Sequence, residues 1–185
     1  TKTFKKIFNY FSIFTIVLGS TFGTFNAANA ATKNIANSST TTSFANGDNV
    51  VVNGAAATFD VANDQFTDLT NSVDTTVTLD ASGAYTISSN ITGATAKTMA
   101  LSIIQGNVIL QGSVIETGTG VVTINIGASD EFNTTGADKA IAAAITSTDA
   151  TGTLDIDGTA TFSDTVQAGI ITIADATTFA STLSN

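Results

Sequence analysis

The sequence predicts an all-β fold, a right-handed parallel β-helix, that follows an N-terminal segment of different character. Three observations lead to this expectation. Short runs from residue 48 onward alternate apolar and polar residues, as strands do when one face is buried. The β-branched residues Val, Ile and Thr dominate these runs. Gly, Asn and Ser separate the runs at short intervals, as expected of tight corners.

Residues 1–30 predict a cleavable secretory signal peptide. Three lysines supply the basic start, and the apolar stretch Ile7–Leu18 follows. Ala28 and Ala30 then lie three positions and one position before a cleavage site whose next residue is Ala31. A retained membrane anchor and an ordinary buried helix are the alternatives. We favour cleavage because the apolar run is shorter than the roughly 20 residues of a membrane-spanning helix.

The remainder of the chain divides into two parts. Residues 31–47 are polar and low in complexity, and they predict a linker or a loose N-terminal cap. Residues 48–185 carry the alternating runs and predict the solenoid itself. In Val121–Ile126, for example, the apolar side chains lie opposite Thr123 and Asn125. The other predicted strands contain Thr76–Asp80, Thr153–Asp157, Ile170–Asp175 and the pairs Phe59/Val61, Tyr85/Ile87, Leu101/Ile103 and Ala160/Phe162.

The spacing of these runs suggests stacked turns. The runs that begin at Thr76, Met99 and Val121 are 23 and then 22 residues apart, whereas the later starts at Thr153 and Ile170 follow at 32 and 17. Solenoids tolerate insertions between turns, so the slip is compatible with one. The predicted corners are Asn46-Gly47-Asp48, Asn53-Gly54, Ser82-Gly83, Gly106-Asn107, Gly118-Thr119-Gly120 and Asp157-Gly158.

Two structural alternatives stay open at this point. A β-sandwich would pair the same strands antiparallel through hairpins. Small core residues and polar corners favour the solenoid. The segment Ala137–Thr146 could form a helix with Asp138 as its N-cap, although Ile141, Ala143 and Ile145 also alternate as in a strand.

Composition excludes several kinds of chemistry. The chain has no His and no Cys, so imidazole-based triads, thiol nucleophiles and the usual zinc sites are impossible. Residues 1–30 contain three of the six lysines and no acid, so the remainder has a formal charge of −12 and no Arg. Such a chain would be repelled by phosphate backbones and anionic lipid headgroups. We therefore predict no nucleic-acid partner, and no membrane contact except through the signal peptide or a membrane barrel beyond these residues.

The acidic residues are the remaining candidates for a site. Asp155 and Asp157 are two positions apart and share the strand face opposite Leu154 and Ile156. We interpret them as solvated surface acids, with calcium ligation and carboxylate catalysis as the alternatives. The adjacent Asp130-Glu131 would diverge on a strand, and we expect a solvated turn there.

Two other features of the sequence give no evidence of a catalytic or cofactor site. Lys97 and Lys139 stand apart from any acidic cluster, and Gly118-Thr119-Gly120 is too short for a dinucleotide fingerprint. The sequence therefore predicts a non-enzymatic protein with no catalytic residue, no cofactor and no bound metal.

The chain resembles the N-terminal part of an autotransporter passenger, most closely that of rickettsial outer-membrane surface antigens. The resemblance rests on the signal that ends at Ala28-Asn29-Ala30 and on a Thr/Asn/Ala-rich texture. That texture is clearest in residues 55–60, 121–127 and 158–162. It implies a β-helix displayed outside a bacterium, for adhesion or as a coat, with residues 48–185 as part of a longer passenger. The C-terminal membrane barrel of that family is not among these residues.

We therefore expect an exported bacterial segment, secreted or at the outer membrane and cell surface. The expected function is that of an adhesin-type passenger, whose partners are host or neighbouring-cell surface molecules. The alternative is a coat or filament protein that assembles with itself.

Overall fold

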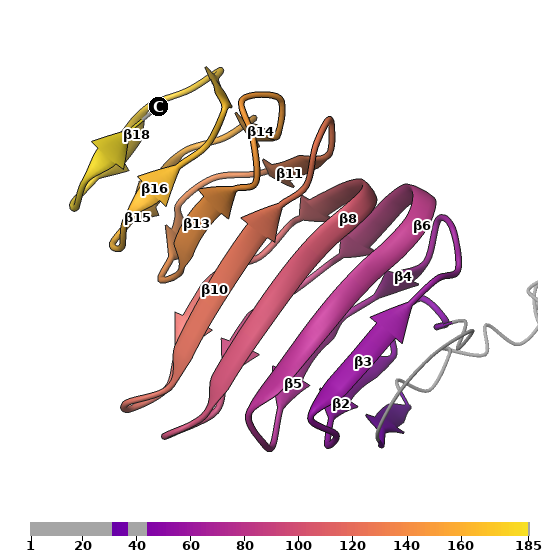
Figure 1. Cartoon of the computed structure of the whole chain (residues 1–185). Coiled ribbons are helices and arrows are strands. Elements are labelled where there is room, and N and C mark those ends of the chain that lie inside the picture. The colour runs from indigo at the N-terminus through magenta and orange to yellow at the C-terminus, as the bar shows by residue number, and fades with distance from the viewer. Residues whose placement is uncertain (1–30, 37–43, 185) are drawn as a thin grey trace, which may run out of the picture.

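The computed structural model describes residues 31–36 and 44–184, which wind through about seven turns of a parallel β-solenoid (Figure 1). Every strand pair in this part of the chain is parallel. The all-β solenoid is thus confirmed. The β-sandwich alternative is wrong, because each strand pairs with a strand one turn away and not with a hairpin neighbour.

Three faces surround the core. The first face is an eight-stranded sheet. Its strands are β1 (Thr32–Ile35), β2 (Asn49–Val52), β5 (Asp68–Asn71), β7 (Ile91–Gly93), β9 (Val114–Glu116), β12 (Lys139–Ile141), β15 (Ala160–Phe162) and β18 (Thr177–Phe179).

The other two faces belong to one eleven-stranded sheet that bends round a corner. The second face contains β3 (Ala56–Phe59), the starts of β6 (Thr75–Ile87) and β8 (Thr98–Leu110), β10 (Val121–Ile126), β13 (Ala144–Ser147), β16 (Val166–Gln167) and β19 (Leu183–Ser184). The third face contains β4 (Gln65–Phe66), the ends of β6 and β8, β11 (Glu131–Thr134), β14 (Thr153–Ile156) and β17 (Ile170–Ile173).

The long strands β6 and β8 cover two faces each because glycines let them turn the corner. Gly83 and Gly106 adopt φ values of +145° and +92° there, a region that disfavours other residues. An added Cβ at Gly106 would also meet the backbone oxygens of Ala81 and Gly83, one turn earlier. The corner therefore needs glycine both for its backbone angle and for the close approach of successive turns.

Unequal corners explain why the sequence repeat slips. Hydrogen bonds that join equivalent positions in neighbouring turns span 17 residues between Ala31 and Asp48 but 27 residues between Ser113 and Ala140. The strands stay in register while the corners absorb the difference. A fixed period is therefore absent from the sequence although the stacking is continuous.

The predicted strands are present with one exception. Val61 lies beyond the end of β3, in the segment that leads to β4. The prediction that Phe59 and Val61 belong to the same strand is therefore wrong. The helix alternative for 137–146 is also wrong. That segment forms β12 and β13, and Ile141 and Ile145 are fully buried between turns. Asp138 adopts a positive φ of 57° at the preceding corner, which a helix N-cap does not.

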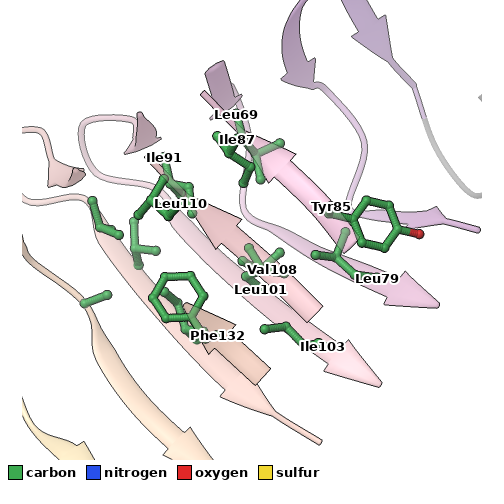
Figure 2. Packing of buried hydrophobic residues seen from close by; sticks show 14 of the residues in the cluster. Leu69, Leu79, Tyr85, Ile87, Ile91, Leu101, Ile103, Val108, Leu110 and Phe132 are labelled. Carbon is green, nitrogen blue, oxygen red and sulfur yellow. The ribbon is translucent and has the colours of Figure 1, made fainter. Parts of the chain in front are cut away.

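Inward side chains form continuous columns through the solenoid (Figure 2). In one column Tyr85, Val108, Phe132 and Leu154 follow each other from turn to turn, and none is exposed. The Tyr85 hydroxyl donates a 2.6 Å hydrogen bond to the Phe59 carbonyl, and burial raises the pKa of this phenol. The only polar atom of this large side chain is thus satisfied inside the core.

A side-chain ladder supports the corner between the third and first faces. Asp68 Oδ1 accepts a hydrogen bond from the backbone N–H of Asn90 at 3.0 Å, and Asn90 Oδ1 accepts one from the backbone N–H of Ser113 at 2.9 Å. Ser113 Oγ accepts from the Ala140 amide at 3.1 Å. Each short polar side chain therefore satisfies a backbone donor of the next turn, which explains why Asp, Asn and Ser occupy these corners.

One buried hydroxyl conflicts with the apolar columns. Thr134 lies between Leu110 and Ile156, is 1% exposed, and its Oγ1 has no hydrogen-bond partner. We expect Thr134→Val, which keeps the shape, to raise the free energy of unfolding by about 1 to 2 kcal/mol because it removes an unsatisfied polar group. Urea unfolding followed by circular dichroism tests this. Destabilisation by Thr134→Val would show that the hydroxyl has a partner in solution.

Candidate functional site

The second face presents a regular outward column of hydrogen-bonding side chains. The column runs through six successive turns along the register of the strands: Thr58, Thr78, Ser102, Asn125, Thr146 and Gln167. Neighbouring strands in a sheet are about 4.8 Å apart, so these groups repeat at that spacing. Within the column Thr146 Oγ1 donates to Asn125 Oδ1 at 3.3 Å.

A second column lies beside it on the same strands. It alternates methyl and hydroxyl groups in the order Ala56, Thr76, Ala100, Thr123 and Ala144. We call the two together the polar columns. They contain no charged side chain, although the protein as a whole is strongly acidic. The result is a neutral surface that repeats along the solenoid axis.

A compact acidic group lies on the third face. Asn133 on β11 donates from Nδ2 to Asp155 Oδ2 and to Asp157 Oδ2, at 3.0 Å each. The two carboxylates lie on the outer side, as predicted, since the alternate residues Leu154 and Ile156 are fully buried. Burial differs within the group. Asp157 is exposed and Asp155 is half-buried, while Asn133 is 7% exposed. The three residues together are called the Asn133 cluster below.

The predicted solvated turn at Asp130-Glu131 is wrong. Asp130 is 7% exposed and its Oδ1 accepts from the Gly106 amide at 2.9 Å. Burial raises the pKa of Asp130, and the Gly106 hydrogen bond opposes that rise. Glu131 begins strand β11. Burial, followed by the nearby Asp155 charge, raises the pKa of Glu131. Sequence reasoning missed these burials because the corner stacks on the turn before it.

Asn133 itself was also missed. It lies 22 residues from Asp155 and 24 from Asp157, and a single Asn inside a strand gives no signal of its own. The register between β11 and β14, which pairs Asn133 with Asp155, is what brings the three together. To predict from the sequence that these three residues meet, one would have to know how many residues each corner contains, because that number sets the register between turns.

The remaining predicted features lie apart from both surfaces. Lys97 is at a corner, where its amide donates to the Ala94 carbonyl at 3.0 Å, and Lys139 begins β12. Gly118-Thr119-Gly120 forms a corner, as predicted, with Gly118 at φ +62°. The predicted signal residues Ala28 and Ala30 lie outside the described residues. Ala31 is exposed, and its amide donates to Asp48 Oδ1 at 3.3 Å.

The described part of the surface carries open hollows. One depression of about 280 Å³ lies beside Ser147, Asp149 and Gln167, and another of similar size beside Asp138, Thr159 and Thr178. Hydrogen bonds from Thr151 lower the pKa of Asp149. Both hollows are open and smaller than most pockets that enclose a ligand. They suit surface contact better than the enclosure of a small molecule.

No group of three or more His, Cys, Asp or Glu residues in residues 31–36 and 44–184 is arranged to hold a metal ion. No helix within these same ranges is long and apolar enough to cross a membrane.

Comparisons with protein families, with curated proteins and with solved structures find no match for this chain. The family resemblance noted above therefore has no support from these comparisons.

Proposed function

We propose that this protein is an exported bacterial surface segment of adhesin type, which contacts other molecules through the outward side of its second face. The observation that carries the proposal is the pair of polar columns, which align neutral hydrogen-bonding groups over successive turns. Each group adds little by itself, but a repeated array can bind a repeated or extended partner with many weak bonds.

Charge supports a particular class of partner. The acidic surface elsewhere would repel nucleic acid, anionic lipid and acidic polysaccharide. The polar columns are neutral, so a host or neighbouring-cell surface molecule with neutral hydrogen-bonding groups could approach them. The proposed location is the outer membrane, the cell surface or the medium, as the N-terminal signal pattern predicts. No catalytic role is proposed.

Self-assembly into a coat or filament is a second candidate. The neutral polar columns that could meet a partner molecule could equally meet the same face of a second copy of the chain.

A binding assay with matched variants tests the adhesin proposal. The fluorescently labelled full chain is incubated with cultured epithelial cells, and half-saturation is measured by flow cytometry. The triple variant Thr78→Ala, Asn125→Ala and Thr146→Ala removes three groups of one column. We expect binding at least about tenfold weaker, because each lost hydrogen bond contributes about 0.5 to 1.5 kcal/mol.

The matched control removes three hydroxyls from the first face through Thr92→Ala, Thr161→Ala and Thr178→Ala. These side chains point outward and lie away from the polar columns. Control binding should equal that of the wild type. Equal binding by both triple variants would reject the polar columns as the contact surface. Polymerisation that rises with protein concentration, without cell binding, would favour the coat alternative.

A further inference from the structure

Asp130 places a carboxylate inside the corner between the second and third faces. The residue is 7% exposed, and its Oδ1 accepts one hydrogen bond, from the backbone N–H of Gly106. Its Oδ2 is shielded from solvent and has no hydrogen-bond partner among the described residues. An added Cβ at Gly127 would meet this Oδ2, which shows how closely the corner encloses it. One donor leaves much of the cost of burying a charged carboxylate uncompensated.

Glu131 adds a second carboxylate directly after the first. It is half-buried on the outer side of β11, in register with Asn107 on β8 and with Thr153 on β14. The aspartates of the Asn133 cluster follow Thr153 on the outer side of the next turn. The charge of Glu131 is therefore partly desolvated and also lies close to charges of the same sign.

The elements packed against these two acids bring further negative charge. Strand β8, on one side, contains no charged residue. On the other side β14 and the residue after it bring Asp155 and Asp157, and the corner at 148–152 brings Asp149. Lys139, the nearest lysine in sequence, begins β12 on the first face. The one ion pair among the described residues involves β1, so no lysine of the described chain pairs with the acids of this region.

We propose that Asp130 and Glu131 form a proton-binding switch, which tightens the stacking of the middle turns as the pH falls below neutral. Protonation removes the buried charge from the corner at Asp130. It also removes the repulsion between Glu131 and the aspartates of the next turn. Both changes favour the close approach of β11 to β14 and of each corner to the corner before it. The switch lies at the third face and its corner, away from the polar columns, and does not depend on the proposed function.

The direction of the pH dependence follows from the two pKa values. Burial raises the pKa of both acids, so the folded chain binds their protons more tightly than the unfolded chain does. Above the ordinary pKa values of Asp and Glu, which are about 4, the folded chain therefore holds more protons. Stability is then lost as the pH rises through the raised pKa values and is regained as the pH falls. The lowered pKa of Asp149 acts in the opposite direction, but only below this window.

Thermal unfolding of the full chain at two pH values tests the switch. We expect the midpoint of the wild type to be higher at about pH 5.5 than at about pH 7.5, by about 2 °C or more. The double variant Asp130→Asn and Glu131→Gln is uncharged at both positions and should lose this rise. If circular dichroism shows that it fails to fold, the single Glu131→Gln replaces it, because that side chain is only half-buried. The single variant should lose part of the rise.

A matched double variant separates the switch from a general relief of negative charge. Asp60→Asn and Asp175→Asn remove the same amount of charge from two exposed positions and should keep the rise of the wild type. Loss of the rise in the Asp130 and Glu131 variant alone supports the proposal. An equal rise in the wild type and both double variants would place its cause in other acids and overturn the proposal. A wild-type midpoint that stays constant or decreases between about pH 7.5 and 5.5 would overturn it too.

Discussion

Phe132→Ala should lower the free energy of unfolding by about 3 to 5 kcal/mol. Phe132 is fully buried on β11, in register with Val108 on one side and Leu154 on the other. Figure 2 shows its ring among the inward side chains of the neighbouring turns. Truncation would leave a cavity in the middle of the column, and the paired backbones on both sides limit how far it can collapse.

The effect should spread beyond one turn. Each turn of a solenoid contacts only its neighbours, so a cavity at Phe132 weakens the contacts that join the N-terminal and C-terminal turns. Urea unfolding followed by circular dichroism measures the loss. Ile104→Ala is the control, since Ile104 is 51% exposed and its loss should change stability by no more than about 0.5 kcal/mol. A similar small change for Phe132→Ala would contradict the packing described here.

Gly158→Ala should lower the free energy of unfolding by about 3 kcal/mol or more, which is at least the upper end of the cost of overpacking a core. Gly158 lies at the corner between β14 and β15, directly against Gly136 of the preceding turn. An added Cβ would overlap the backbone carbonyl of Gly136. Backbone cannot rotate away as a side chain can, so the two turns would have to separate.

Gly93→Ala provides the control for Gly158→Ala. At Gly93 the nearest atom to an added Cβ is a methyl group of Val122, at 2.8 Å, and that side chain can adjust. The expected cost is about 1 kcal/mol. The comparison is made by thermal unfolding of both variants under the same conditions. Equal stability of the two variants would show that the corner backbones are not stacked as closely as described.

The alternation of the sequence was sufficient to predict the fold class and most strands. A buried inward column requires an apolar residue at every second position, and runs such as Val121–Ile126 show this without any tertiary information. The corners were predictable for a related reason. Positions such as Gly47, Gly106 and Gly118 need a positive φ, and glycine marks them. The same local pattern led to the wrong prediction that Val61 belongs to the strand of Phe59, because alternation alone does not show where a strand ends.

The tertiary structure decided which residues of neighbouring turns lie side by side. The stacking offset varies between 17 and 27 residues, so no period in the sequence aligns the turns. Asn133 therefore met Asp155 and Asp157, and Asp130 became buried against the previous corner, without any local signal. Local alternation determined which side of each strand faces inward. Only the lengths of the corners, summed along the folded chain, determined which outward groups share a column and which acids share a cluster.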